Sequence, residues 1–359
     1  MDFIQTEVIQ VNPVQPEPES IERGAALLRA GELVVFPTET VYGLGADALR
    51  TSAVEGIFAA KGRPYSDPLI AHIADERDLE KVATNIPEIA RELAQAFWPG
   101  PLTLILPAGP HIPRLVTAGL ATVAVRMPRH PVALALIRAA EVPIAAPSAN
   151  RFMHVSPTTA QHVLTDLEGR VPLILDGGPC EVGVESTILD LCAEVPIILR
   201  PGGISLEALR TLLPDVQPPV RRDQRREEQH NEHLAQKSPG QMLIHYAPSV
   251  PSFLFEGSNE TMRTAMLAEV QRRQEQGERV GVLIADEDIE AFQESGALMY
   301  ALGRSTAAEQ IATRLFAGLR ALEEAEVQVI LCRNFSEKGL GLAIRDRLLK
   351  ATGGKIVHV

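Results

Sequence analysis

The feature that most constrains this chain is a regular alternation of short apolar runs with helical patterns, interrupted once. Between residues 21 and 213, runs rich in Val, Ile and Leu alternate with segments whose apolar residues recur at helical spacing. The runs include ELVVFP, PLTLILPA and VPLILDGG. Residues 214–237 show no apolar period, and the alternation resumes after residue 251. Strands that alternate with helices predict an α/β fold, and the interruption predicts two domains.

The length of the chain supports this division, because 359 residues exceed the usual size of one domain. We expect a first α/β domain with a mixed sheet over 1–213, a linker over 214–248 and a smaller Rossmann-like α/β domain over 249–359. Prolines and mixed charges are typical of a solvated linker. The glycine clusters KGLGLAI and ATGGKI lack the spacing of a dinucleotide fingerprint or a P-loop, so neither predicts a nucleotide site.

Two helix boundaries can be predicted from single residues. The helical pattern that starts at Ser52 should end at Pro64, because proline cannot donate the next backbone hydrogen bond. Thr306 and Glu309 have the spacing of a capping box, which predicts the start of a long amphipathic helix there.

Composition excludes some classes of protein. The formal net charge of -12 argues against a broad basic face for nucleic acid, although Arg221, Arg222, Arg225 and Arg226 form one basic cluster among acids. The three cysteines show no metal-like spacing, so we expect no metal site built from them and a reducing compartment. No apolar run reaches the length of a signal peptide core at the start or of a membrane span elsewhere, so we expect a cytoplasmic protein with no membrane partner.

Polar clusters follow several of the predicted strands of the first domain. Hydroxyls and amides beside Lys and Arg suit a bound polyanion, because Lys supplies a point charge and Arg a planar fork for phosphate or carboxylate. The clusters contain Thr38, Glu39, Thr40 and Tyr42 in FPTETVYGLG; Lys61, Arg63, Ser66, Asp67 and His72 in KGRPYSDPLIAHI; Thr122 and Arg126 in TVAVRMP; Ser148, Asn150 and Ser156 in APSANRFMHVSPT; Glu185, Ser186 and Thr187 in GVEST; and Arg200 in LRPGG.

Each of these residues also has a structural explanation when it is taken alone. A lysine before a turn is usually solvated, and a histidine such as His72 in an apolar strand is often a hydrogen-bonded core residue. Arg126 is different, because an arginine between apolar strand residues needs an anionic partner. The recurrence of polar clusters at strand ends favours a common site.

The motifs resemble those of the YrdC-type threonylcarbamoyl-AMP synthases. The resemblance rests on FPTETVYGLGADA, KGRPYSDPLIAHI, WPGPLTLIL, VAVRMP, APSANRFMHVSPT and ESTILDL. SPGQMLIHYAP, residues 238–248, is similar to the linker signature of the long, two-domain branch of that family. The resemblance implies a YrdC-like twisted mixed sheet with a concave, positively lined cavity, joined by the linker to the Rossmann-like domain.

The family's activity implies that L-threonine, bicarbonate and ATP are condensed to threonylcarbamoyl-AMP and pyrophosphate. ATP is then a substrate, magnesium is expected to accompany it, and no protein ligand set for a metal is expected. The product would pass to the tRNA threonylcarbamoyl transferase machinery, and direct contact with tRNA is left open. Two alternatives are weaker: an RNA-binding module, which the acidic charge disfavours, and a hydrogenase-maturation relative, which would carry Cys-x-x-C motifs absent here.

The resemblance also assigns roles to individual residues. Lys61 and Arg63 match the family's K-x-R element, and Ser148 and Asn150 match its S-x-N element, so these four would hold the triphosphate and carry catalysis. The nucleotide side would be lined by Arg63, Asp67, Thr122, Ser148, Ser156, Arg200 and Tyr246. The threonine side would be lined by Thr40, His72, Arg126, Ala146 and Ser186. We expect the linker segment 238–248 to act as a lid, with Tyr246 reaching the nucleotide, and Pro37 to Tyr42 to form a wall facing threonine.

Overall fold

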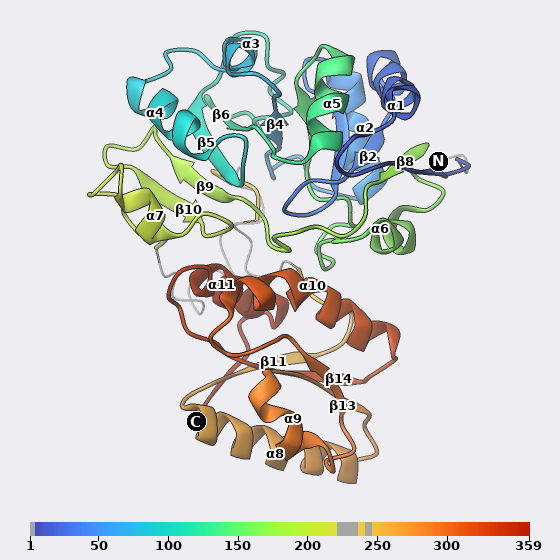
Figure 1. The fold of residues 1–359 in the computed structure, drawn as a ribbon, viewed down its shortest axis with the longest axis vertical. Coiled ribbons are helices and arrows are strands. Elements are labelled where there is room, and N and C mark those ends of the chain that lie inside the picture. Colours follow the sequence, from blue (N-terminus) through green and yellow to red (C-terminus); the bar gives the residue numbers. More distant parts are fainter. Residues whose placement is uncertain (1–3, 221–235, 241–245) are drawn as a thin grey trace. The chain divides into compact units, whose positions relative to one another are not determined.

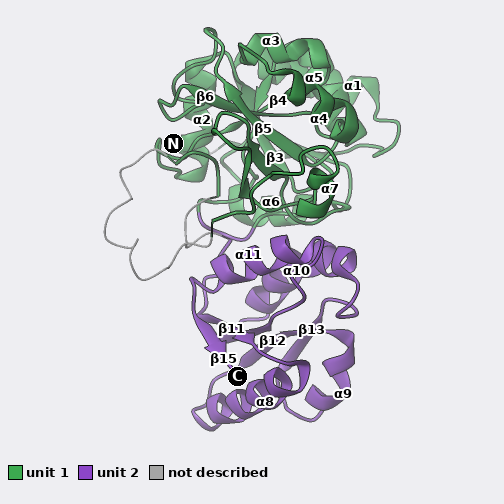
Figure 2. Cartoon of the chain, turned by 90° about the vertical axis from the view of Figure 1, so that its left-hand side faces the viewer, with its two compact units in different colours: residues 1–152, 156–241 green, residues 153–155, 242–359 purple. Residues whose placement is uncertain are grey.

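The chain folds into two compact units in a computed structural model that describes residues 4–220, 236–240 and 246–359. The first unit comprises Met1–Phe152 and Ser156–Gln241, and the second comprises Met153–Val155 and Met242–Val359 (Figure 2). The basic cluster at Arg221, Arg222, Arg225 and Arg226 lies outside the described residues. No helix in the described part is both long and apolar enough to cross a membrane.

The first unit is built on a ten-stranded mixed sheet in the order β1-β8-β2-β3-β7-β4-β6-β5-β9-β10 (Figure 1). Pairs such as β4 with β6 are parallel, whereas β3 runs antiparallel to both β2 and β7. This arrangement confirms the predicted mixed α/β sheet. The strands are β1 (Glu7–Gln10), β2 (Val34–Phe36), β3 (Gly43–Asp47), β4 (Ile70–His72), β5 (Leu102–Pro107), β6 (Thr122–Arg126), β7 (Ile144–Ala145), β8 (Leu173–Asp176), β9 (Thr187–Asp190) and β10 (Ile197–Arg200).

Helices cover both faces of this sheet. Because side chains alternate along a strand, Val34 and Phe36 pack on one side with α1 and α5, while Val35 packs on the other with α2, α4 and α6. Both cores consist mainly of Ala, Val, Leu and Ile, and they hold the strand ends in place. The helices are α1 (Pro18–Ala30), α2 (Thr51–Lys61), α3 (Leu79–Val82), α4 (Glu88–Phe97), α5 (Pro131–Ala140), α6 (Ala160–Leu167) and α7 (Leu206–Arg210), with a 3-10 turn at Glu76–Asp78.

Helix α2 ends three residues before Pro64, where the sequence predicted its end. Lys61 is its last residue, and Gly62 follows in the left-handed conformation with φ of 66°. Glycine adopts this conformation without steric cost, so it terminates the helix before Pro64 is reached. Lys61 and Arg63 flank this glycine and contact different partners, the Ser148 carbonyl for Lys61 and the Asp67 carboxylate for Arg63.

The second unit is a five-stranded sheet in which all neighbouring strands are parallel, in the order β13-β12-β14-β11-β15. Helices α8 and α9 cover one face, and α10 and α11 cover the other (Figure 1). The predicted smaller α/β unit is thus confirmed, although its strand order differs from the 3-2-1-4-5 order of the dinucleotide-binding Rossmann sheet. The elements are β11 (Ser252–Glu256), α8 (Asn259–Glu275), β12 (Val280–Ile284), a 3-10 turn at Asp286–Asp288, α9 (Ile289–Phe292), β13 (Leu298–Ala301), α10 (Ala308–Glu324), β14 (Val329–Arg333), α11 (Gly341–Ala351) and β15 (Ile356–His358).

The capping box predicted at the start of α10 is wrong. Ala307 occupies the N-cap position, and in the described part of the chain this position has no side-chain capping hydrogen bond. Helix α10 is stabilised instead by its buried apolar stripe, which includes Ile311, Leu315 and Leu319.

The segment between the two sheets is shared between the units. Val216 is buried in the core of the first unit, and the Gln236 backbone N–H donates to the Ser66 carbonyl, also in the first unit. In the second unit, the Ala247 N–H donates to the Met153 carbonyl, and the Arg320 guanidinium on α10 donates to the Val155 carbonyl. Three residues from the middle of the chain therefore belong to the second unit.

Candidate functional site

The K-x-R and S-x-N elements meet in the first unit. The Lys61 ammonium donates hydrogen bonds to the backbone carbonyls of Ser148, at 2.6 Å, and of Asn150. Lys61 is 4% exposed, and its burial, followed by the nearby charge of Arg63, lowers its pKa well below the usual value. The sequence placed these residues in one site, and the structure brings their atoms into contact.

Arg63 and Asp67 form a buried ion pair beside this contact. The Arg63 guanidinium lies 3.0 Å from the Asp67 carboxylate and also donates to the carbonyls of Asp67 and Pro68. The pKa of Asp67 is raised because the carboxyl group is buried, and the charges of Arg63, Lys61 and Arg200 only partly offset this effect. Two arginines and one lysine thus act on one carboxylate, an arrangement that suits a bound polyanion.

Arg200 connects the predicted nucleotide side with the predicted threonine side. It is the last residue of β10, and its guanidinium donates to the Ser186 carbonyl, at 3.0 Å and 3.2 Å, and to the Ser186 hydroxyl, at 3.1 Å. It also donates to the Pro239 carbonyl at 3.5 Å. The Ser186 hydroxyl in turn lies 2.7 Å from that of Thr103. The two predicted subsites therefore share one chain of polar contacts.

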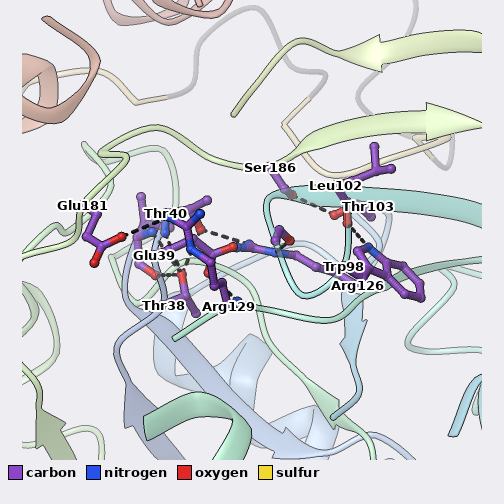
Figure 3. A network of polar contacts seen from close by, with 12 residues as sticks. Thr38, Glu39, Thr40, Trp98, Leu102, Thr103, Arg126, Arg129, Glu181 and Ser186 are labelled. Carbon is purple, nitrogen blue, oxygen red and sulfur yellow. Dashed lines mark hydrogen bonds and ion pairs between the residues drawn. The ribbon is translucent and has the colours of Figure 1, made fainter. Parts of the chain in front are cut away.

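The threonine-side arginine has an anionic partner within the protein. Arg126 ends β6, and one terminal nitrogen lies 2.7 Å from a carboxylate oxygen of Glu39 (Figure 3). Its other terminal nitrogen donates to the Thr40 hydroxyl at 2.9 Å, and its Nε donates to the Gly100 carbonyl at 3.3 Å. Glu39 was a candidate in the sequence but received no role, although the need for an anionic partner of Arg126 was the signal that could have found it.

His72 lies beside Arg126 because β4 and β6 pair in parallel with these two residues in register. Its Nδ1 is 3.1 Å from the Ile70 carbonyl, and its ring meets Phe36 edge to face. Burial lowers its pKa to about 3, and the charge of Arg126 adds to this effect. His72 is therefore neutral at physiological pH, so it can offer a hydrogen bond to a substrate but no charge.

The remaining predicted residues are placed as follows. Ala146 is buried, with its N–H bonded to the Ile70 carbonyl, and the Ser156 hydroxyl donates to the Glu185 carboxylate at 2.5 Å. Thr122 is half-buried at the start of β6 and, among the described residues, makes no hydrogen bond to another predicted site residue. Tyr246 is buried in the second unit, where its ring packs on Phe316 and lies under the Arg347 guanidinium.

The loop from Pro37 to Val41 carries polar side chains into the interior, but Tyr42 does not belong to this set. Its hydroxyl donates to Asp176 and to the Gly178 carbonyl, and the ring is fully buried. A cavity of about 660 Å³ is lined by Glu39, together with residues that the sequence did not single out: Gln10, Val11, Pro13, Val14, Arg129, His130, Pro131, Asp176, Gly177, Gly178, Pro179 and Glu181. Among the described residues, no group of three or more His, Cys, Asp or Glu side chains is arranged to hold a metal ion.

Two family models match the chain in order. The model described as "Telomere recombination" covers residues 26–202, and the model for the C-terminal domain of threonylcarbamoyl-AMP synthase covers residues 204–353. A threonylcarbamoyl-AMP synthase of Bacillus subtilis is 47% identical over 340 residues, which is 94% of each chain. One of Pyrococcus abyssi is 44% identical over 346 residues, 96% of this chain and 97% of the relative.

A solved structure shows the same fold. The crystal structure of P. abyssi Sua5 complexed with L-threonine superposes with a TM-score of 0.90 at 43% identity, over 98% of this chain and 99% of that one. Both halves of the chain, in their order and nearly at full length, thus have counterparts among these proteins. The chain belongs to the family of two-domain threonylcarbamoyl-AMP synthases.

Proposed function

We propose that this protein is an L-threonylcarbamoyladenylate synthase, a nucleotidyltransferase that forms threonylcarbamoyl-AMP and pyrophosphate from L-threonine, bicarbonate and ATP. The observation that carries the proposal is the near full-length similarity to synthases of that name, one of them solved with L-threonine. The buried cationic cluster of Lys61, Arg63 and Arg200 supports it, because a triphosphate substrate needs such a site.

The proposed reaction has two steps. Threonine, through its neutral amine, and bicarbonate form a carbamate with loss of water. A carbamate oxygen then attacks the α-phosphorus of ATP, the bond to the bridging oxygen breaks, and pyrophosphate leaves. Because one anion attacks another, catalysis should depend mainly on positioning and on neutralisation of charge.

On the nucleotide side, Lys61, Arg63 and Arg200 would neutralise the triphosphate, and Asp67 would hold Arg63 in place through the ion pair at 3.0 Å. Ser148 and Asn150 would present the loop whose carbonyls Lys61 already binds. Thr122, Ser156 and Tyr246 are proposed to complete the nucleotide contacts. Magnesium is proposed to travel with ATP, which fits a site with few carboxylates, because Mg²⁺ is commonly held by phosphates and water.

On the threonine side, Arg126 would bind the substrate carboxylate, and neutral His72 would offer a hydrogen bond. The hydroxyls of Thr40 and Ser186 would contact the polar groups of threonine, while Ala146 would leave room for its methyl group. We further propose a cytoplasmic location and transfer of the product to the tRNA threonylcarbamoyl transferase machinery.

Pyrophosphate release tests the function directly. With threonine, bicarbonate and ATP present, we expect release of pyrophosphate together with formation of threonylcarbamoyl-AMP, identified by mass spectrometry. Omission of any one substrate should abolish formation of that product. Pyrophosphate release that is independent of threonine would assign the protein to another reaction.

A further inference from the structure

Glu39 is a buried carboxylate whose two oxygens are both engaged. One oxygen is 2.7 Å from the Arg126 guanidinium, and the other accepts a hydrogen bond from the Arg129 backbone N–H at 3.1 Å (Figure 3). Glu39 is 1% exposed and Arg126 is 4% exposed, so the pair is shielded from water. The backbone contact holds the carboxylate oxygen that the arginine does not pair with.

We infer that Glu39 is a positioning residue for the threonine substrate and acts through Arg126. The inference rests on the proposed role of Arg126 in binding the substrate carboxylate. Arginine has five N–H donors in a rigid plane. Hydrogen bonds to Thr40 and Gly100 use two of these donors, and the third nitrogen forms the ion pair with Glu39 without a hydrogen bond, which leaves three donors among the described contacts.

Glu39 supplies the strongest of these three contacts. It is the shortest, and it is the one that joins two charged groups, whereas Thr40 and Gly100 offer neutral oxygens at 2.9 Å and 3.3 Å. The attraction between two opposite charges is strong where both are buried in a medium of low dielectric constant, so the ion pair with Glu39 dominates the orientation of the guanidinium. A substrate carboxylate must then approach the donors that Glu39 leaves available.

The location of the pair favours this role over a purely structural one. A buried ion pair contributes little net stability compared with a well-packed apolar pair, so its presence alone does not explain the fold. Here it lies among buried hydroxyls, since Thr40 bonds both Arg126 and Thr38. Glu39 also cancels the charge of Arg126 in the free protein, so the arginine can remain buried and oriented before threonine arrives.

The test measures threonine affinity in two ways. Isothermal titration calorimetry gives the threonine Kd, and pyrophosphate release gives kcat and KM for threonine and ATP separately. We expect Glu39→Gln to raise the threonine Kd and KM by roughly tenfold or more, because misplacement of a positioning group weakens binding. The kcat should stay within about twofold and the KM for ATP should not change, since the contact is made equally in ground and transition states.

Two further variants separate positioning from general damage. Glu39→Asp keeps the charge and should give a smaller rise in the threonine Kd with an intact fold. It therefore replaces Glu39→Gln in the binding measurement if Glu39→Gln does not fold. Glu181→Gln is the matched control: Glu181 pairs with Arg129 at 3.0 Å, but 71% of its side chain and 53% of that of Arg129 are exposed. This control should behave as wild type.

A double-variant cycle tests whether Glu39 acts through Arg126. If it does, Glu39→Gln combined with Arg126→Lys should bind threonine no more weakly than Arg126→Lys alone. Additive losses, or an equal fall in kcat at unchanged threonine Kd, would overturn the inference. If the wild-type protein bound threonine but formed no pyrophosphate, only the proposed reaction would be wrong. If it did not bind threonine, both the proposed reaction and the inference on Glu39 would be wrong.

Discussion

At the scale of single residues, the sequence located the polar clusters but did not identify one partner. An arginine in an apolar strand requires an anion, and the sequence did not show which anion Arg126 meets. The structure supplies an internal anion, Glu39, from a loop far away in sequence. No local pattern links the two residues, because Glu39 lies in the loop after β2 and Arg126 ends β6, and the sheet places three other strands between β2 and β6.

Arg63 should have separable effects on stability and on activity. Arg63→Ala leaves the buried Asp67 carboxylate without its ion-pair partner, which should cost roughly 3–5 kcal/mol of unfolding free energy. Asp67→Asn in the same chain should restore much of this stability, measured by urea unfolding, because the uncompensated charge is removed. Turnover should remain at least roughly tenfold below wild type, since the phosphate contact is still missing. Full recovery of turnover in the double variant would show that Arg63 has only a structural role.

His72 should make the protein less stable in acid. Its pKa is about 3 in the folded protein and 6.5 when unperturbed, so the unfolded chain binds a proton more readily between these values. Stability is therefore complete above pH 6.5 and falls as the pH drops toward 3, by about 1.4 kcal/mol per unit. Urea unfolding at pH 7.5 and pH 5 should show a loss of about 2 kcal/mol from this group, which a His72→Gln variant should lack. The same pH dependence in both proteins would refute the assignment.

At the scale of elements, strands and helices with strong periodicity were predictable, and those defined by partners were not. GLGAD forms β3 although its glycines disfavour strands, because β2 and β7 pair with it on both sides. Residues 7–10 form β1 in the same way, against β8. Helix ends depended on backbone conformation, as Gly62 shows for α2. The linker signature lies partly outside the described residues, which exclude 241–245.

Tyr246 allows a test of the predicted lid segment. Its ring packs on Phe316 and under Arg347, and its φ of 62° is unusual for a residue other than glycine. We expect Tyr246→Ala in the full chain to weaken ATP binding and to release AMP from hydrolysed intermediate faster, because water would reach the mixed anhydride. Tyr246→Phe keeps the ring and should remain close to wild type. If Tyr246→Ala had the ATP affinity and the intermediate lifetime of the wild type, the segment would only connect the two domains and would not act as a lid.

At the scale of the whole molecule, the boundary between the units crosses the chain at more than one point. Residues 153–155 lie between Asn150 and Ser156, both predicted to contact the nucleotide, yet Arg320 and Ala247 of the second unit bind their carbonyls. The sequence could not predict this, because the segment has no pattern that distinguishes it from an ordinary loop.

Removal of the Arg320 contact should therefore affect nucleotide binding from a distance. Arg320→Met should raise the KM for ATP several-fold while the KM for threonine changes little, since Ser156 directly follows the segment that Arg320 holds. Arg314→Met, an exposed position on the same helix, is the control. Hydrogen exchange should show faster exchange around residues 153–156 in Arg320→Met alone. Unchanged exchange and unchanged KM would confine Arg320 to the stability of the second unit.

The discontinuous second unit also has a consequence for the order of events on the ribosome. Val155 and Arg320 are separated by 165 positions, so the carbonyl is synthesised long before its donor. At translation rates of about 5–20 residues per second, the interval is roughly 8 to 30 seconds. The first unit, whose residues end at Gln241, can fold within that time, whereas Val155 must wait for its hydrogen-bond donor until Arg320 has emerged.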